Sequence, residues 1–367
     1  MRETTATRPK TMRLLSMLLV VTMLVTAQGF TSLAATVSRN EVATEEREAE
    51  SSPEAESSPE TQSNPETESN TETENIMESE ISDTTQAENV MQAGTTTPSN
   101  PVHNCTGDDD GTDTTTWSYV YFGSYPQSEV TDTTIISAID SAILDGSGTI
   151  ANAGVDVWVN GTKYRRISKS DTNYDEYFNN VSNNGYRYFK WERIKWRVLD
   201  NNGSTLFVVA DGALDCKDYN DVYTSVTWED STIRSWLNDS FYNTAFSIEE
   251  QNAIVAQNVV NADNPDYGTE GGNNTTDKVY LLSIDEVTNA TYGFCSDDST
   301  YSASRWMQAS AYANARGAWR STSSGYEGNC WWWLRSPGYD SNSAADVGTY
   351  GYVYGSNQRE PTHSFSK

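Results

Sequence analysis

The uneven distribution of aromatic residues constrains this chain more than any other feature of its sequence. All 11 tryptophans lie after residue 104, and Phe30 is the only phenylalanine, tyrosine or tryptophan before it. Large apolar side chains supply most of the area that a protein buries on folding, so the core is expected in the back portion. The 367 residues therefore predict one globular domain behind a long front segment.

The net charge narrows the classes of partner. The chain has 52 Asp and Glu against 24 Lys and Arg, a net charge of −28, and residues 105–367 keep 35 acidic against 18 basic residues. Nucleic acids and anionic membrane surfaces attract basic proteins, so neither is expected as a partner. With only His103 and His363 available, a multi-histidine zinc site or a Ser-His-Asp triad is also disfavoured.

The first 34 residues have the pattern of a secretory signal peptide. Basic residues up to Arg13 precede an apolar run from Leu14 to Ala27, and small residues follow. Cleavage is expected after Ala34 or Ala27. The alternative is an uncleaved anchor helix, but the run is shorter than the roughly 20 residues that a bilayer span needs. The protein is thus predicted to be extracellular or on the cell surface, with no membrane insertion after signal removal.

Residues 35–104 predict a disordered acidic linker. They are rich in Glu, Ser, Thr, Asn and Pro, with near-repeats at 50–54 and 56–60. Such a composition buries too little apolar area to offset the entropy of ordering. A flexible chain of this length spans on the order of 45 Å. It is expected to act as a solvated spacer, or as a stalk that holds the domain away from a cell wall.

Residues 105–367 alternate strand and turn signals. Residues 155–159 and 162–167 flank Asn160-Gly161, which favours a tight hairpin turn, and residues 194–199 and 205–210 form a second hairpin. Further strands are expected at four places: Ser118–Phe122, Lys278–Leu282, Trp331–Arg335 and Ala345–Tyr354.

Helices are fewer. One is expected after Asp132, with Ile136 and Ile139 on its apolar face, and another carries Ile233 and Leu237. Two more are indicated by the capping boxes Ser247–Glu250 and Ser283–Glu286. Long polar loops at 261–277 and 291–304 complete an α+β fold: a single mixed domain of antiparallel hairpins with a few helices.

Four cysteines remain after signal removal: Cys105, Cys216, Cys295 and Cys330. An even number in an exported chain allows two disulfides in three connectivities, and free thiols are the alternative. No CxxC pair occurs, which argues against a zinc ribbon or a thioredoxin-type site.

Five segments occur in the order of a known domain type across about 220 residues: Tyr121–Pro126, Ile194–Leu199, Thr227–Asn238, Val279–Ser283 and Trp332–Gly338. Together they resemble an uncharacterised extracellular bacterial domain, common in gut Firmicutes, that is built around a Trp-Leu-Arg-Ser-Pro-Gly motif. The resemblance implies a relation to the C-type-lectin-like and formylglycine-generating-enzyme-like folds. It also implies a closing Gly-Val-Arg-Pro-Ala-like strand that the residues after Tyr354 lack, so the chain is expected to be truncated or frame-shifted there, or to close differently.

The sequence favours no catalytic residue, metal or cofactor. The oxidases of the related fold hold copper with a close cysteine pair, whereas Cys295 and Cys330 are 35 positions apart. Asp108–Asp113 is rich in carboxylates, but Tyr119 stands where an EF-hand loop has its bidentate glutamate, so a solvated acidic turn is the better interpretation. No carboxylate pair is marked for hydrolysis.

Aromatic recognition remains as the candidate chemistry. Trp331 and Trp333 share a face of a regular strand, and an exposed tryptophan suits sugar rings or peptide side chains. Arg335 would share that face and is expected to pair with an internal carboxylate rather than with a ligand. Tyr350, Tyr352 and Tyr354 alternate along the following predicted strand, and this row could extend the same platform or pack on a helix.

The predicted ligand-binding residues are therefore Trp331, Trp333, Arg335, Tyr350 and Tyr352. They predict a non-catalytic module that recognises an extracellular glycan or protein. The alternatives are a divergent extracellular enzyme, either an oxidase of the related fold or a glycan hydrolase, and a degenerate gene product.

Overall fold

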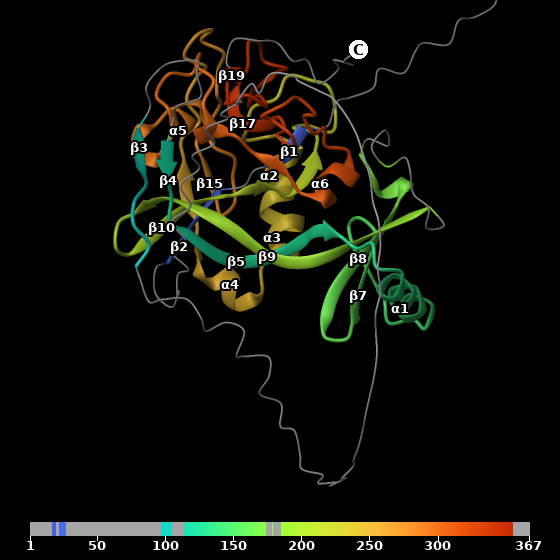
Figure 1. The fold of residues 1–367 in the computed structure, drawn as a ribbon. Helices are drawn as coiled ribbons and strands as arrows, with labels where there is room; N and C mark the ends of the chain where they lie inside the picture. Colours follow the sequence, from blue (N-terminus) through green and yellow to red (C-terminus); the bar gives the residue numbers. More distant parts are fainter. Residues whose placement is uncertain are drawn as a thin grey trace, which may run out of the picture. The chain divides into compact units, whose positions relative to one another are not determined.

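The computed structural model describes residues 17–19, 22–26, 97–104, 114–173, 178 and 185–354 (Figure 1). Most of the predicted linker lies outside the described residues, as do the acidic segment Asp108–Asp113 and residues 355–367. The described residues form mixed, mostly antiparallel sheets with few helices. The fold is α+β, as the sequence predicts.

The larger sheet has eight strands, in the order β13-β2-β10-β9-β8-β7-β6, with β5 paired to β9. In chain order they are β2 (Thr22–Thr26), β5 (Tyr119–Glu129), β6 (Thr149–Ile150), β7 (Val155–Val159), β8 (Thr162–Ser168), β9 (Tyr186–Asn201), β10 (Thr205–Ala210) and β13 (Ile254–Val255). Strands β5 and β9 cross the domain as a long twisted ribbon (Figure 1). Strand β2, from the predicted signal peptide, is an interior strand of this sheet.

The second sheet has the order β12-β1-β17-β18-β19. Its strands are β1 (Met17–Leu19), β12 (Asp215–Lys217), β17 (Trp332–Pro337), β18 (Ala344–Val347) and β19 (Val353–Tyr354). Three two-stranded ladders complete the strands: β3 (Val102–Asn104) with β4 (Thr114–Thr116), β11 (Gly212–Ala213) with β16 (Gln308–Ala309), and β14 (Gln257–Val259) with β15 (Thr275–Asp277).

Both predicted hairpins are confirmed. Asn160 and Gly161 have φ angles of 50° and 75°, so they form the tight turn between β7 and β8 that positive φ values allow. Strands β9 and β10 pair around the turn at Gly203. The strand expected at 118–122 runs on to Glu129 as β5.

The predicted helices and caps are also confirmed. Helix α1 (Thr133–Leu144) begins at Asp132, whose carboxylate accepts from the N–H groups of Thr134 and Ile135. Residues 232–245 run helically as α2 (Thr232–Trp236), the π-turn η4 (Leu237–Phe241) and α3 (Tyr242–Ala245). Capping boxes start α4 (Ile248–Ala253) and α5 (Ile284–Val287). The other helical segments are η2 (Lys169–Asp171), η5 (Ala290–Tyr292), η6 (Ala303–Arg305) and α6 (Ala311–Arg316).

Two predicted strands were wrong. Residues 278–282 are not a strand, because the Asn238 side chain takes the place of a neighbouring strand: it accepts from the N–H groups of Lys278 and Val279 and donates to the Val279 carbonyl. Residues 345–354 are a hairpin, β18 and β19, rather than one strand. Gly351 has a φ angle of +80°, which ends the extended conformation between Val347 and Val353.

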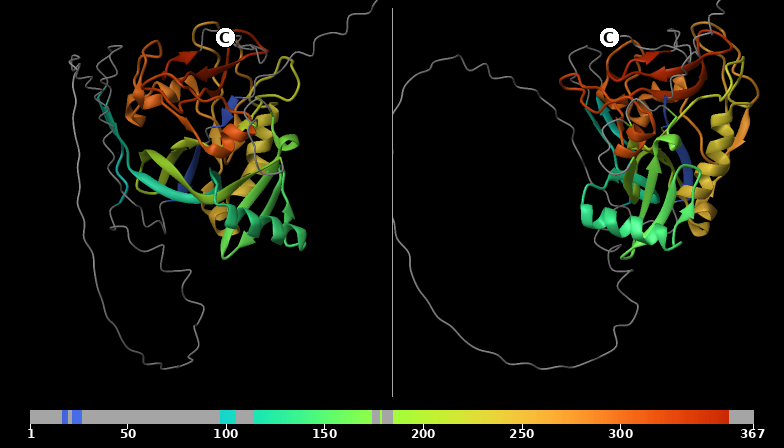
Figure 2. Two further views of the ribbon diagram at one scale, coloured as in Figure 1. Left: turned by 45° about the vertical axis from the view of Figure 1, so that its right-hand side comes forward. Right: turned by 90° about the vertical axis from the view of Figure 1, so that its right-hand side faces the viewer.

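The core has two parts. The smaller part packs Ile136 and Ile139 of α1 on Val157 and Tyr164 of β7 and β8. Figure 2 shows the helix alongside these strands. The larger part lies between the two sheets and the remaining helices, and its fully buried tryptophans are Trp196, Trp228, Trp332 and Trp333. Met23 and Val25 of β2 belong to it as well. The front segment thus contributes to a core that the aromatic distribution places entirely in the back portion.

The described cysteines differ in their bonding. Cys295 is disulfide-bonded, whereas Cys216 and Cys330 keep their thiols and are buried. Cys295 and Cys330 are therefore not joined to each other, and Cys105 lies outside the described residues. Within the part of the chain that the structure describes, no helix is long and apolar enough to cross a bilayer.

Candidate functional site

The five predicted ligand-binding residues lie in different environments, and only Trp333 and Arg335 belong to β17. Trp333 and Arg335 are 2% and 5% exposed. Trp331, which precedes the strand, remains half-buried, as do Tyr350 and Tyr352. The strand is covered on both faces, because the Trp332 indole N–H donates to the Arg305 carbonyl while the Trp333 ring packs against Tyr219.

Arg335 links several segments of the interior by ion-pair and hydrogen-bond contacts. Its guanidinium pairs with the carboxylate of Glu286, at 2.5 and 3.1 Å, and donates to the carbonyls of Val260 and Leu281. The expected internal carboxylate partner is confirmed. A planar group with five donors suits this set of acceptors, so Arg335 joins β17 to α5 and to two loops.

Trp331, Tyr350 and Tyr352 meet other aromatic residues at the surface. The rings follow one another with centroid separations between 4.4 and 6.1 Å. We call this set the aromatic strip. In order of contact, its members are Trp306, Tyr326, Tyr350, Tyr301, Tyr352, Tyr354 and Trp331.

Each residue of the strip is partly exposed. Tyr301 is 42% exposed, and the other six are half-buried. Neighbouring rings meet at angles from 31° to 80°: three contacts are edge-to-face and the other three are tilted. Surface aromatic groups in a row offer apolar contact area and polar atoms together, which suits a ligand that also has both.

Two glycines bring the strip together. A Cβ at Gly351 would lie 2.0 Å from the Ser302 carbonyl oxygen, so only glycine lets the β18–β19 turn approach the loop that carries Tyr301. A Cβ at Gly348 would lie 2.5 Å from the Tyr354 ring and 3.1 Å from the Trp331 ring. The closeness of these rings to the turn thus depends on the absence of side chains.

Arg305 fixes the loop that carries Tyr301. It is fully buried and donates to the carbonyls of Cys295, Asp297, Thr300 and Gly351 at 2.5–2.9 Å. The bond to Gly351 ties the loop to the β18–β19 turn, and the other three hold the loop together. A second bond, from the Trp306 indole N–H to the Tyr350 carbonyl at 3.1 Å, acts between the same two segments. The strip is therefore built on a hydrogen-bonded support.

The polar groups of the strip are suited to neutral partners. Partial burial, with Tyr350 and Tyr301 close by, raises the pKa of Tyr326, so its hydroxyl remains a donor well above neutral pH. Hydrogen bonds from Ser299 and Thr300 lower the pKa of Asp297, which holds a negative charge on the loop beside Tyr301. A negatively charged ligand would be repelled there.

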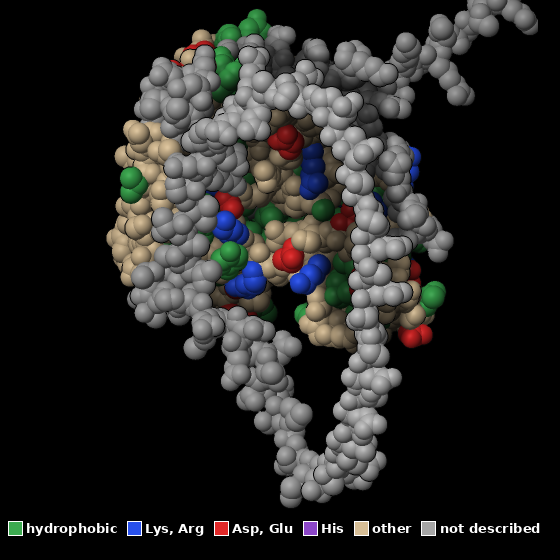
Figure 3. Space-filling model, viewed as in Figure 1, with side chains coloured by type: hydrophobic (Ala, Val, Ile, Leu, Met, Phe, Trp, Pro, Cys, Tyr) green, Lys and Arg blue, Asp and Glu red, His purple; other side chains and the backbone are tan. Residues whose placement is uncertain are grey.

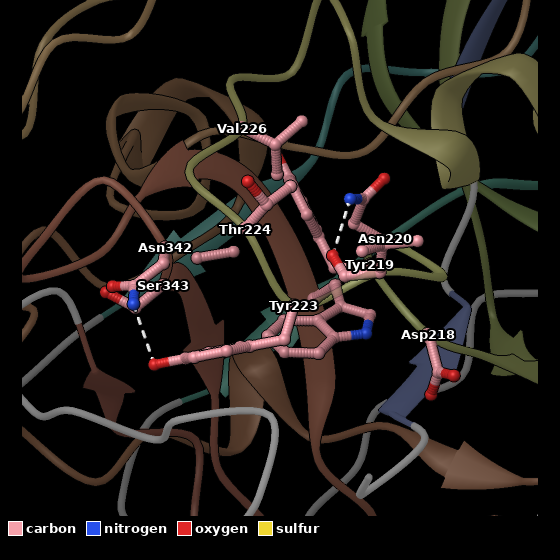
Figure 4. A pocket seen from close by; sticks show the side chains of 11 residues that line it. Asp218, Tyr219, Asn220, Tyr223, Thr224, Val226, Asn342 and Ser343 are labelled. Atoms are coloured by element: carbon pink, nitrogen blue, oxygen red, sulfur yellow. Dashed lines mark hydrogen bonds between the residues drawn. The ribbon is translucent and has the colours of Figure 1, made fainter.

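A small pocket lies on another part of the domain (Figure 4). Its volume is about 20 Å³, enough for one or two water molecules. Trp333 forms part of its wall, and Tyr223 makes a 2.7 Å hydrogen bond with the Asn342 amide across it. Asp218 is the single carboxylate among the lining residues, so the pocket does not bring together a carboxylate pair.

Charged side chains are paired rather than gathered. Figure 3 shows Lys and Arg side chains beside Asp and Glu on the face that it draws, and the closest pairs include Arg197 with Asp211 at 2.6 Å. Among the described residues, no group of three or more His, Cys, Asp or Glu lies close enough to hold a metal ion.

Four residues of the site were not predicted from the sequence: Tyr301, Arg305, Trp306 and Tyr326. The one available signal was the length of the 291–304 loop, because long loops in compact domains are often functional. Ligand contact by Trp331, Tyr350 and Tyr352 remains a prediction. Burial leaves Trp333 and Arg335 little surface for a ligand.

Comparison with known proteins supports an uncharacterised domain family. Residues 202–362 match the family model described as "Domain of unknown function (DUF6273)". The match includes the aromatic strip, the pocket and β17. Neither the comparison with curated proteins nor the comparison with solved structures gave a match.

Proposed function

We propose that this domain is a non-catalytic recognition module of the cell exterior, and that its aromatic strip binds a neutral, linear glycan. The observation that carries the proposal is the strip itself: seven consecutive aromatic rings, each partly exposed, on a support fixed by Arg305. Sugar rings have apolar C–H faces and a rim of hydroxyls, so a row of Tyr and Trp side chains meets both needs.

Charge favours a neutral glycan over an acidic one. Residues 105–367 have 35 acidic and 18 basic residues, and Asp297 and Asp298 lie on the loop of Tyr301. Arg305, the cation beneath the strip, is fully buried and donates to backbone carbonyls, so it is not exposed to a ligand. An acidic polysaccharide would therefore meet repulsion without a compensating ion pair.

The arrangement of the strip favours a glycan over a protein. The seven rings follow one another in a row, and a row suits a chain molecule better than a broad surface. The C-type-lectin-like relation that the sequence resemblance implies fits this role and is part of the proposal.

The proposal is tested with neutral oligosaccharides of six units from the cello, xylo and manno series. We expect the full chain to bind at least one series in calorimetric titration, and Trp331→Ala to weaken that binding about tenfold, the loss of roughly 1.4 kcal/mol of stacking. Tyr301→Ala is expected to act in the same direction, because its ring joins the two halves of the strip.

A matched control is available in Trp158→Ala. Trp158 is 66% exposed on β7, in the sheet that does not contain the strip. Its removal should leave glycan affinity unchanged. Equal losses for Trp158→Ala and Trp331→Ala, or no binding of any series by the full chain, would count against the strip as a glycan site.

A further inference from the structure

Residues 22–26 occupy a groove that is bordered on both sides by other strands. Strand β2 pairs antiparallel with β10 from Val209↔Thr22 to Thr205↔Thr26, and with β13 at Ile254↔Val25 and Val255↔Leu24. At its start, Thr22 exchanges two backbone hydrogen bonds with Tyr280, at 2.7 and 3.0 Å. The segment thus uses its backbone donors and acceptors as an interior strand does.

The same segment enters the second sheet. Strand β1 pairs antiparallel with β12, from Met17↔Lys217 to Leu19↔Asp215, and parallel with β17 at Leu18↔Trp332. Residues 17–19 and 22–26 therefore complete both sheets of the domain. Without them, β10, β13, β12 and β17 would each have an unpaired edge, which invites pairing with another extended chain.

The burial of individual side chains determines which peptide sequences the groove accepts. Thr22 and Met23 are fully buried and Val25 is 2% exposed, whereas Leu24 is only half-buried. The Thr22 hydroxyl also donates to the Tyr280 carbonyl at 2.7 Å. The groove therefore selects an extended segment with apolar residues at the positions of Met23 and Val25.

The position of this segment in the chain separates it from the domain. The residue that follows β2 is 27, and the described part resumes at residue 97, so about 70 residues lie between them. A tether of this length still raises the effective concentration of the segment at the groove, because the entropy of loop closure grows slowly with length. The affinity of the groove itself is therefore measured only after the connection is cut.

We propose that the domain has a strand-acceptor groove, bordered by β10 and β13 in one sheet and by β12 and β17 in the other, and that β1 (residues 17–19) and β2 (residues 22–26) of the same chain occupy it through non-covalent contacts. The apolar segment with the pattern of a secretory signal is then also a core strand. Removing it empties the groove, and a peptide of the same pattern refills it. This inference does not depend on the proposed glycan binding. It concerns the chain that retains residues 17–19 and 22–26, because cleavage of the predicted signal after Ala27 or Ala34 separates them from the domain.

The test uses the full chain, produced without export, with a protease recognition sequence inserted between residues 60 and 61. After folding, the chain is cut and passed through gel filtration in native buffer. We expect the N-terminal fragment to elute with the domain, and a fluorescent peptide of residues 15–28 to replace it during prolonged incubation. Loss of the fragment under native conditions overturns the proposal, whether or not the domain stays folded.

Matched peptides test the preference of the groove. A peptide with Met23→Thr and Val25→Thr should bind the groove with an affinity at least tenfold lower than that of the unchanged peptide, while Leu24→Thr should lower the affinity less. Equal binding of the three peptides overturns the proposed groove. In the uncut chain the double substitution should lower the melting temperature more than Leu24→Thr, and the reverse order contradicts the inference.

Discussion

Replacing Gly351 by alanine tests how the aromatic strip is assembled. Gly351 has a φ angle of +80°, and an added Cβ would lie 2.0 Å from the Ser302 carbonyl oxygen. The left-handed conformation costs about 1–2 kcal/mol for a residue with a side chain. Relieving the backbone clash costs about 1–3 kcal/mol more, as overpacking does. Gly351→Ala should therefore lower the free energy of unfolding by about 2–5 kcal/mol.

Gly203 provides a control with the same conformation and no clash. Its φ angle is +87°, and nothing lies within 4 Å of the position of its Cβ. Gly203→Ala should therefore show the conformational cost alone, about 1–2 kcal/mol. The two free energies of unfolding are measured by denaturant titration, followed by tryptophan fluorescence.

Glycan affinity separates the two variants further. The clash at Gly351 pushes the loop of Tyr301 away from Tyr350 and Tyr352, so Gly351→Ala should weaken binding, while Gly203→Ala should not. The reasoning is refuted if Gly351→Ala is no more destabilising than Gly203→Ala, because the close approach to Ser302 would then have no energetic weight.

Three further predictions concern the interior. Arg335→Met should destabilise the domain by about 3–5 kcal/mol in denaturant titration, because it leaves Glu286 without its ion-pair partner; a loss below about 1 kcal/mol would contradict the role of this pair. Burial raises the pKa of the Cys330 thiol, so this thiol should resist alkylation at pH 8 in the native protein and react after unfolding. Rapid labelling of Cys330 in the native protein, located by peptide mapping, would disprove its burial. Burial also raises the pKa values of Tyr219 and Tyr280. As the pH rises, these tyrosines and Cys330 lose their protons in the unfolded chain before they do so in the folded protein, so the free energy of unfolding should fall above about pH 9. A denaturation midpoint that stays flat or rises between about pH 8 and about pH 10.5 would contradict this.

Local sequence signals predicted most of the regular elements. The Asn160-Gly161 turn, the Asp132 cap and the capping boxes at Ser247 and Ser283 all depend on neighbouring residues, and each is found in the structure. Such features need no knowledge of distant contacts, because side chains within a few residues satisfy the backbone groups concerned.

Contacts between distant residues were the ones missed. The Asn238 amide replaces a strand for residues 278–279, and nothing near Asn238 in the sequence indicates this. The role of residues 22–26 is missed for a similar reason. A short apolar run is compatible with both a secretory signal and a buried strand, and the strand role depends on β10 and β13, more than 170 residues away.

The candidate site was predicted in part. Trp331, Tyr350 and Tyr352 do lie on one partly exposed surface, but alternation along a strand is not the reason. Tyr350 and Tyr352 lie in the turn between β18 and β19, and their neighbours come from the loop of Tyr301. Successive side chains point to opposite faces only within a regular strand. Trp331 precedes β17, and this explains why its surroundings differ from those of Trp333.

Hydrogen–deuterium exchange of the full chain, with and without a saturating six-unit oligosaccharide, tests the aromatic strip most directly. We predict that the sugar slows exchange in residues 297–306 and 348–354, which form the support of the strip, and leaves residues 218–226 of the pocket unchanged. Protection confined to residues 218–226 and 342–344 would place the ligand in the pocket instead and contradict the strip as the binding surface.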